Sequence, residues 1–505
     1  MRNLRFLCLA LVILSASIQA KSQMTHMPVR EGVQFRAGLL DNMMLLNNLG
    51  ESELPFVKQM LYKWAETRLA RVEGSDYSSL ADYHEFQNYC IKHKILLIGG
   101  PLLGNISDRS ADIWVRTSKP SEVSILLIIN GKERTFGPVA TTIESQLSAV
   151  VRVDELDANK EYSYEVFVDN EEIPCAYETK FRTTSPSRKI NTRIVFGSCF
   201  HRWGLANMQQ TTTIIERSPN AFLGLGDIAA QDRNGSVNWH SLDYFARDLY
   251  PAWQKLVARV PFYALWDDHD YFDNDKYGVP AGYKTQDKEN VWDVFRYAWC
   301  NPSYGFGDDK KGVFFKTTIG ASDVIMVDHR YFRTKGSLLG KEQMDWLKQQ
   351  LLACKSPFII IGCGTMWSDY VSNGKDSWGK FDTEGREEIL RFIEENNIKG
   401  VLFISGDRHG SRGFRIPRTS GFSFYEFGVA SLGGLGGQPA TKPEWNTQTY
   451  GLNGGFAFGE FTFDTKPKDP TVTFRLVGEE GNVIYKLTVK QSELTPANWS
   501  PVSAK

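Results

Sequence analysis

The chain has 505 residues, of which 42% are hydrophobic and 13% aromatic, which is enough apolar material for roughly two to four packed domains and excludes a disordered or fibrous protein. Its 58 Lys and Arg residues nearly balance 59 Asp and Glu residues, giving a net charge of −1. This balance predicts no nucleic-acid-binding surface and no attraction to an anionic membrane, and it favours a small molecule as the partner.

Residues 1–20 have the pattern of a secretory signal peptide. Arg2 and Arg5 precede the apolar run Phe6–Leu14, and small residues follow up to Ala20. The apolar run is shorter than the ~20 residues that a membrane-spanning helix needs, although a retained membrane anchor is the alternative. We therefore expect cleavage near Ala20, no transmembrane span afterwards, and a periplasmic or secreted protein.

Export would permit disulfides, but cysteines are sparse. Beyond the signal peptide the cysteines are Cys90, Cys175, Cys199, Cys300, Cys354 and Cys363. Six cysteines in a chain of this length do not form a disulfide scaffold, so each has to be judged by its neighbours.

Residues 21–94 are predicted to form an N-terminal helical segment. Between Leu54 and Trp64 the apolar residues recur at spacings of three and four, Ser52 is placed to cap this helix, and a second helix is predicted over Leu80–Ile91.

In residues 95–185 the hydrophobic period changes to two. The run Glu161–Val168 is typical, and polar pairs at Asn130–Gly131 and Asp169–Asn170 indicate hairpin turns. This pattern predicts a small β-sandwich of the fibronectin type III-like kind.

Residues 188–492 alternate between strands and helices, which predicts a layered α/β domain with C-terminal strands. The predicted strands are Arg193–Phe196, Ala221–Leu225, Phe262–Trp266, Val324–Val327, Phe358–Ile361, Val401–Ile404, Phe458–Phe463, Val472–Val477 and Val483–Val489. The clearest helices are Lys341–Cys354 and Thr383–Asn396.

Four of these strands run directly into residues that can ligate metals. The segments are Cys199 to Arg202, Asp227, Asp267 to Asp275, and Asp407 to His409. Such strand ends converge on one edge of an α/β sheet, so these segments are expected to meet.

The segment 267–275 holds five aspartates. Two unit charges about 4 Å apart repel by ~1 kcal/mol in water and by ~4 kcal/mol at an effective dielectric constant of 20. A hard cation, which prefers carboxylate and amide oxygens, would explain this crowding, and an exposed acidic loop is the alternative.

The combination of Gly197-Ser198-Cys199, Gly226-Asp227, Trp266-Asp-Asp-His-Asp270 with Asn274, and Gly406-Asp407-Arg-His409 resembles the PhoD-like alkaline phosphatases, within the calcineurin-like metallophosphoesterase superfamily. The resemblance implies an α/β metallophosphoesterase catalytic domain preceded by a small helical segment and a β-sandwich. It also implies a phosphoric ester hydrolase with two or more metal ions that activate water.

By the same resemblance, metal ligands come from each motif: Cys199 as an iron ligand, Asp227 between metals, and Asp267, Asp268, Asn274, Asp407 and His409 around them. The family uses Ca²⁺ and Fe³⁺, but its common tyrosine three residues after the Gly-Asp aspartate is Ala230 here, with Asp232 as one substitute. Zn²⁺, Mn²⁺ and Mg²⁺ therefore stay open, and Cys199 is either a thiolate ligand or half of a disulfide.

Three further residues are candidates for catalysis. His269 is placed to give a proton to the leaving alkoxide or, alternatively, to make a structural hydrogen bond to an aspartate. Arg202, with His201 beside it, is a candidate phosphate contact or a solvated loop residue. Arg330 lies in Asp328-His329-Arg330, which resembles an Asp-x-Arg element of these phosphatases. The resemblance implies that the arginine of this element faces the site. The glycine-rich Leu432–Gly437 lacks the Gly-Lys-Ser/Thr ending of a phosphate loop and is interpreted as a turn.

The main hypothesis is an exported phosphodiesterase or phosphomonoesterase acting on a small phosphate ester or a cell-envelope phosphodiester. The alternatives are a catalytically idle exported binding protein on the same fold and a metal-dependent hydrolase of non-phosphate esters. The sequence makes no prediction of the oligomeric state.

Overall fold

The computed structural model describes residues 23–26 (backbone only), 56–185, 191–229, 236–368, 377–434 and 447–496, with the side chain of Asn453 also left out. The predicted signal peptide, the capping residue Ser52, and Ala230 with Asp232 lie outside the described residues.

The N-terminal helices are α2 (Phe56–Leu69) and α3 (His84–His93). The second helix starts later than Leu80 because a separate 3-10 turn, Tyr77–Leu80, precedes it, capped by the Asp76 side chain, which accepts the Ser78 N–H. Tyr77 stacks on Phe245, so this segment packs against the part of the chain that is predicted to be catalytic, residues 188–492, and that is called the catalytic part.

The sandwich has a three-stranded sheet of order β2-β3-β6 and a second sheet of order β5-β4-β7-β8, in which β9 also pairs with β7. The strands are β2 (Leu97–Gly104), β3 (Ala111–Thr117), β4 (Ser121–Ile129), β5 (Lys132–Thr141), β6 (Ser148–Val153), β7 (Glu161–Val168), β8 (Glu171–Ile173) and β9 (Lys180–Arg182). Both predicted hairpin turns are present, and their four residues have the positive φ that tight hairpins require.

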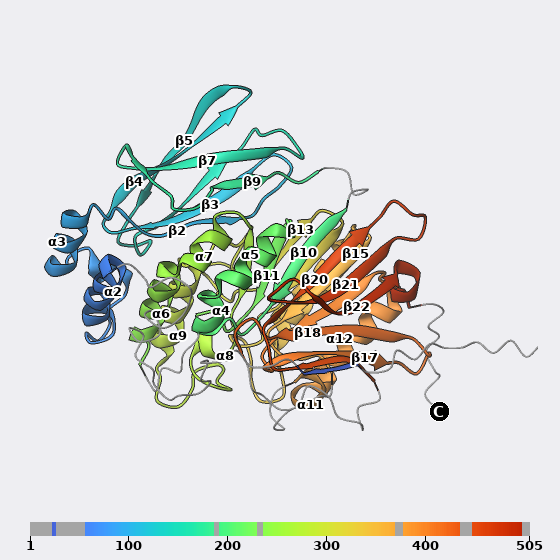
Figure 1. Ribbon diagram of the computed structural model, residues 1–505. Coiled ribbons are helices and arrows are strands. Elements are labelled where there is room, and N and C mark those ends of the chain that lie inside the picture. Colours follow the sequence, from blue (N-terminus) through green and yellow to red (C-terminus); the bar gives the residue numbers. More distant parts are fainter. Residues whose placement is uncertain are drawn as a thin grey trace, which may run out of the picture.

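The sandwich is held closely against the catalytic part (Figure 1). A Cβ atom added at Gly99 of β2 would lie 2.6 Å from Asp248 Oδ2, and one at Gly104 would lie 2.2 Å from the Cys300 carbonyl oxygen. The Trp114 indole also donates to the Tyr297 carbonyl at 2.9 Å. These contacts hold the sandwich against the catalytic part.

The catalytic part contains two larger sheets, of order β1-β19-β17-β18-β16-β15-β14-β13 and β12-β11-β10-β20-β21-β22. The strands of the first are β1 (Gln23–His26), β13 (Phe315–Ile319), β14 (Ser322–Met326), β15 (Phe358–Cys363), β16 (Val401–Ser405), β17 (Gly410–Pro417), β18 (Ser423–Ala430) and β19 (Gln448–Asn453). Those of the second are β10 (Thr192–Gly197), β11 (Ala221–Leu225), β12 (Phe262–Leu265), β20 (Ala457–Asp464), β21 (Thr471–Gly478) and β22 (Val483–Lys490).

The two sheets pack face to face through aromatic side chains. The ring of Phe427 in β18 lies 5.1 Å from that of Phe461 in β20 and 4.5 Å from that of Phe474 in β21. Helices cover the outer faces (Figure 1): α5 to α7 lie beside the six-stranded sheet, and α10 with α12 beside the eight-stranded sheet. The helices are α4 (His201–Leu205), α5 (Met208–Glu216), α6 (Asn238–Leu249), α7 (Pro251–Val257), α8 (Asp268–Tyr271), α9 (Thr285–Arg296), α10 (Gly340–Ala353), α11 (Trp378–Phe381) and α12 (Thr383–Glu395), with a 3-10 turn at Gln491–Leu494.

The parallel pairing of neighbouring strands places the loops that carry the candidate site residues. Strands β10, β11 and β12 are parallel neighbours in one sheet, as are β14, β15 and β16 in the other. The loops that follow these strands therefore share one edge of the layered structure, as predicted.

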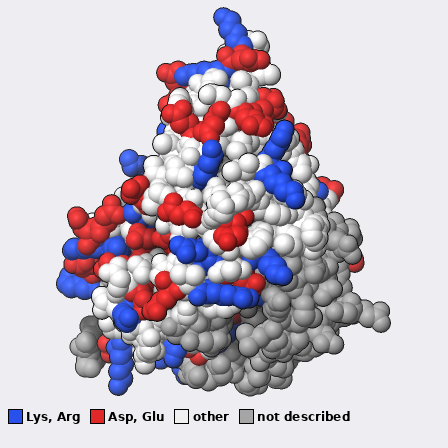
Figure 2. Space-filling model, turned by 90° about the vertical axis from the view of Figure 1, so that its left-hand side faces the viewer, with Lys and Arg blue, Asp and Glu red and all other residues white. Residues whose placement is uncertain are grey.

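Charges of both signs are spread over the face drawn in Figure 2. On the face drawn in Figure 2, acidic and basic side chains alternate, and the residues described there form no large patch of one sign. Among the described helices, none is both long and apolar enough to cross a membrane.

Candidate metal centre

Three site residues follow their strands in a left-handed backbone conformation. Cys199 after β10, Asp227 after β11 and Asp407 after β16 have φ angles of 55°, 53° and 66°. Non-glycine residues adopt this region at a cost of about 1–3 kcal/mol each and keep it where surrounding contacts enforce it, often at functional sites. Here the Cys199 N–H donates to the Gly226 carbonyl at 3.2 Å, and the Asp407 N–H donates to Ser198 Oγ at 3.1 Å. The three loops are thus bound to one another.

A group of four carboxylates forms where these loops meet. Asp227, Asp267, Asp268 and Asp407 each offer an oxygen, and the four oxygens lie within 4.8 Å of one another. Within the described part of the chain, the buried Oδ1 of Asp227 and Oδ2 of Asp267 accept no hydrogen bond. Buried carboxylate oxygens without donors are costly, and a cation is the partner that this arrangement fits.

The carboxylates differ in the direction in which their surroundings shift their pKa. Burial, and then the neighbouring Asp268, raise the pKa of Asp227 well above its usual range. Burial also acts to raise the pKa of Asp268, but His269, Arg330 and the N–H groups of Asp275 and His269 lower it below the ordinary range. Asp268 is therefore ionised without further help, whereas Asp227 needs a nearby cation to stay ionised.

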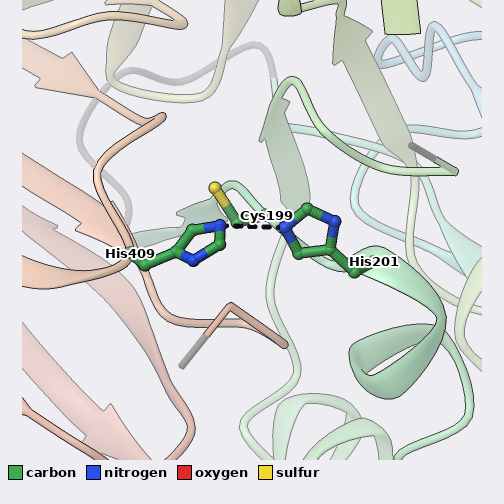
Figure 3. A group of neighbouring side chains, drawn as sticks. All are labelled: Cys199, His201 and His409. Carbon is green, nitrogen blue, oxygen red and sulfur yellow. Dashed lines mark hydrogen bonds between the residues drawn. The ribbon is translucent and has the colours of Figure 1, made fainter. Parts of the chain in front are cut away.

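A second group contains sulfur and nitrogen donors. Cys199 Sγ and one ring nitrogen each of His201 and His409 lie within 4.8 Å of one another. Figure 3 shows the two imidazole rings facing each other with the thiol beside them; their Nε2 atoms are 3.0 Å apart. Metal–nitrogen bonds of about 2.0–2.1 Å at a tetrahedral angle place two such nitrogens about 3.3 Å apart, so a small shift would admit an ion.

The pKa shifts in this group act in two directions, because burial keeps the thiol protonated until a cation is bound but keeps one imidazole neutral. Burial, and then Asp227, raise the pKa of the Cys199 thiol well above its usual range. Burial, with His409 and His269 nearby, lowers the pKa of His201 well below its usual range, so its ring is neutral and has a lone pair to offer. Cys199 is a free thiol here, as are the other five cysteines that the structure describes.

The remaining predicted residues lie at different distances from this centre. His269 offers a ring nitrogen within 4.8 Å of oxygens of Asp227 and Asp268. Arg330 is fully buried, and its Nη2 lies 3.9 Å from Asp268. The side chain of Arg202 is buried and pairs with Asp243 of α6 at 3.2 Å, while Asn274 is exposed; their roles as phosphate contact and metal ligand stay predictions.

The five aspartates of residues 267–275 do not all belong to the carboxylate group. Asp270 accepts the backbone N–H groups of Ile228 and Asp267 at 3.2 and 3.3 Å, and Asp273 accepts the Tyr283 hydroxyl. Only Asp267 and Asp268 join the carboxylate group. Part of the crowding thus has a structural purpose.

The sequence interpretation missed three contributions. His201 joins the sulfur–nitrogen group, a role that its spacing two residues after Cys199 could have indicated. His329 lies against Asp267, and the described part of the glycine-rich segment, Leu432 to Gly434, packs against the sulfur–nitrogen group: Gly433 and Gly434 donate to the Cys199 carbonyl, both at 2.8 Å. A Cβ at Gly434 would lie 2.7 Å from the His409 ring, so this glycine leaves room for the imidazole.

Comparison with known proteins gives two matches to family models. Residues 241–474 match the model of the PhoD-like phosphatase, and residues 94–186 match a domain of unknown function (DUF7800). No curated protein matches the sequence.

Solved structures share the fold. The structure of PhoD is similar at 18% identity and a TM-score of 0.63, covering 79% of this chain and 91% of that chain. The purple acid phosphatase PPD1 from yellow lupin (Lupinus luteus) seeds is similar at 13% identity and a TM-score of 0.57, covering 77% of this chain and 74% of that one. These likenesses confirm the predicted fold class.

Proposed function

We propose, on the match of residues 241–474 to the PhoD-like phosphatase model, that this phosphoric ester hydrolase cleaves phosphodiesters, phosphomonoesters or both at the metal centre described above. The observation that supports this most directly is the carboxylate group of Asp227, Asp267, Asp268 and Asp407, with donor-free buried oxygens on Asp227 and Asp267 among the described residues.

The residues suggest two kinds of metal position, which lie next to each other where Cys199 Sγ contacts Asp227 Oδ2 at 3.5 Å. The carboxylate group would hold a hard cation, and Cys199, His201 and His409 would hold a transition metal. When bound, such ions neutralise phosphate charge and lower the pKa of a water molecule. Calcium and iron are the proposed metals by resemblance, and the sulfur–nitrogen donors also suit zinc.

His269 is the proposed proton donor to the leaving oxygen. Its ring nitrogen lies beside Asp227 and Asp268, at the rim of the carboxylate group, and the side chain is only partly buried. A histidine at such a rim can reach a bound ester and exchange its proton with solvent. Removing it should lower the rate while leaving the metals bound.

The native substrate is proposed to be a small phosphate ester or a phosphodiester of the cell envelope. This part of the proposal rests on the signal-peptide pattern of residues 1–20 alone, which predicts export to the periplasm or out of the cell.

The test uses protein lacking residues 1–20 and measures initial rates on bis-p-nitrophenyl phosphate and p-nitrophenyl phosphate before and after chelation. Asp268→Asn should abolish hydrolysis, whereas Asp309→Asn, which changes an exposed aspartate, should not. The ratio of the two rates separates diesterase from monoesterase. A folded protein that hydrolyses neither substrate with any added metal would refute the proposal and favour a catalytically idle binding protein.

A further inference from the structure

The two oxygens of Asp267 have opposite surroundings. Oδ1 accepts from His329 Nε2 and from Arg330 Nε, each at 2.7 Å, and Arg330 Nη2 lies 2.5 Å away. Oδ2 accepts no hydrogen bond from any residue that the structure describes. The side chains of all three residues are fully buried, so these contacts are not shared with solvent.

The donors are themselves held in place. Asp328, next to His329, accepts the Trp266 indole N–H at 2.8 Å and the Val313 N–H at 3.0 Å, which anchors this loop between the two sheets. Beside the contact with Asp267, a Cβ at Gly364 would lie 2.4 Å from His329 Cε1 and 2.9 Å from Asp267 Cγ. Only a glycine after β15 leaves room for the imidazole at this position.

Arg330 is also held in place by hydrogen bonds to several partners. Besides Asp267, its guanidinium donates from Nη1 to the Lys276 carbonyl at 3.4 Å, and its own carbonyl accepts the Gly278 N–H at 3.2 Å. The arginine thus ties the acidic loop to the end of β14. A fully buried guanidinium with these partners is poorly placed to grip a phosphate from solvent.

We infer that His329 and Arg330 are positioning residues that hold Asp267 by Oδ1 and thereby present Oδ2 to the cation of the carboxylate group. This inference rests on the proposed metal centre, and it assigns to His329 a role that the Asp-x-Arg resemblance leaves open. Donors that orient a metal-ligating carboxylate typically change metal affinity by about 10- to 100-fold when removed.

The test compares two substitutions of His329 that each introduce a side-chain amide. In His329→Gln the side-chain amide can occupy the place of Nε2 and donate to Asp267, whereas in His329→Asn it is too short to reach. Mn²⁺ is titrated into metal-free protein and free Mn²⁺ is followed by electron paramagnetic resonance, with no substrate present. We expect His329→Asn to bind Mn²⁺ about 10- to 100-fold more weakly than the wild type, and His329→Gln to stay within about threefold.

Equal Mn²⁺ affinity for all three proteins would overturn the inference. An equal loss of Mn²⁺ affinity in both variants would also overturn it, because a purely steric role of the ring predicts no difference between the two amide side chains. Circular dichroism and the melting temperature establish that each variant is folded; if His329→Asn is not, His329→Leu replaces it as the variant without a donor. Because the measurement does not involve turnover, an absence of phosphoesterase activity would refute the proposed function and leave this result to stand separately.

Discussion

A Cβ atom at Gly226 would lie 2.4 Å from the Cβ of Asp267 and 2.6 Å from its backbone nitrogen. The loops after β11 and β12 therefore touch where only a glycine fits. This close approach places Asp227, the next residue along the chain, beside the Asp267–Asp268 pair.

Gly226→Ala is expected to separate these loops and to abolish metal binding and hydrolysis. Gly226 also has a φ of +94°, so backbone strain has to be separated from collision. Gly282 is a matched control, because it has the same φ of +94° with nothing within 4 Å of its added Cβ. Gly282→Ala should cost about 1 kcal/mol and keep its metals, measured by urea unfolding and metal analysis. Retained metal in Gly226→Ala would contradict the steric argument.

Asp248 is the counter-ion of a buried cluster at the junction of the three parts of the chain. Arg247 pairs with it at 2.7 Å, and Arg116 of the sandwich lies over the ring of Tyr77; both arginines are fully buried. Asp248→Asn leaves two buried guanidinium groups without a negative charge, so we expect a loss of about 3–5 kcal/mol in the free energy of unfolding.

The control for this change is Asp345→Asn, which breaks an exposed pair with Lys341 and should cost less than about 0.5 kcal/mol. Urea unfolding followed by tryptophan fluorescence measures both. A loss below about 1 kcal/mol for Asp248→Asn would show that the cluster is not needed as an ion pair.

Metal removal should make stability depend on pH. In the metal-free protein, burial and Asp268 raise the pKa of Asp227, so the folded state binds more protons than the unfolded state, and stability falls as pH rises through the folded pKa. A bound cation removes this loss. The difference in melting temperature between loaded and chelated protein should therefore widen as the pH rises above about 4, the ordinary pKa of an aspartate, and less so in Asp227→Asn. A constant difference would contradict this.

Much of the architecture could be predicted because its signals are local. The apolar run Ala221–Leu225 is β11 in full, α10 differs from its predicted range by one residue at each end, and α12 differs by one residue at its C-terminal end alone. Strands β13, β17, β18 and β19 were missed. In β17 and β19 glycine and polar residues blur the alternation, and β19 pairs with segments that are distant in the sequence. The predicted domain boundaries stay predictions.

The candidate site was predictable where ligand residues follow strands, as with Cys199, Asp227 and Asp407. It was not predictable where contacts depend on how the two sheets pack. His329 follows β14 in one sheet and meets Asp267, which follows β12 in the other, and no pattern along the chain reports such a contact.

Lys58 provides a test of how the N-terminal helix docks. Its ammonium donates to two neutral oxygens, the Leu249 carbonyl at 3.3 Å and Gln254 Oε1 at 2.9 Å, and burial lowers its pKa to about 8. Because the unfolded state then binds more protons than the folded state above about pH 8, the stability of the wild type should rise with pH up to about 10.5, where the unfolded lysine also loses its proton. Lys58→Met removes this rise, whereas Lys63→Met, at an exposed position on the same helix, should preserve it. Melting temperatures across this range provide the measurement, and parallel curves for the wild type and Lys58→Met would show that the ammonium is not desolvated at this contact.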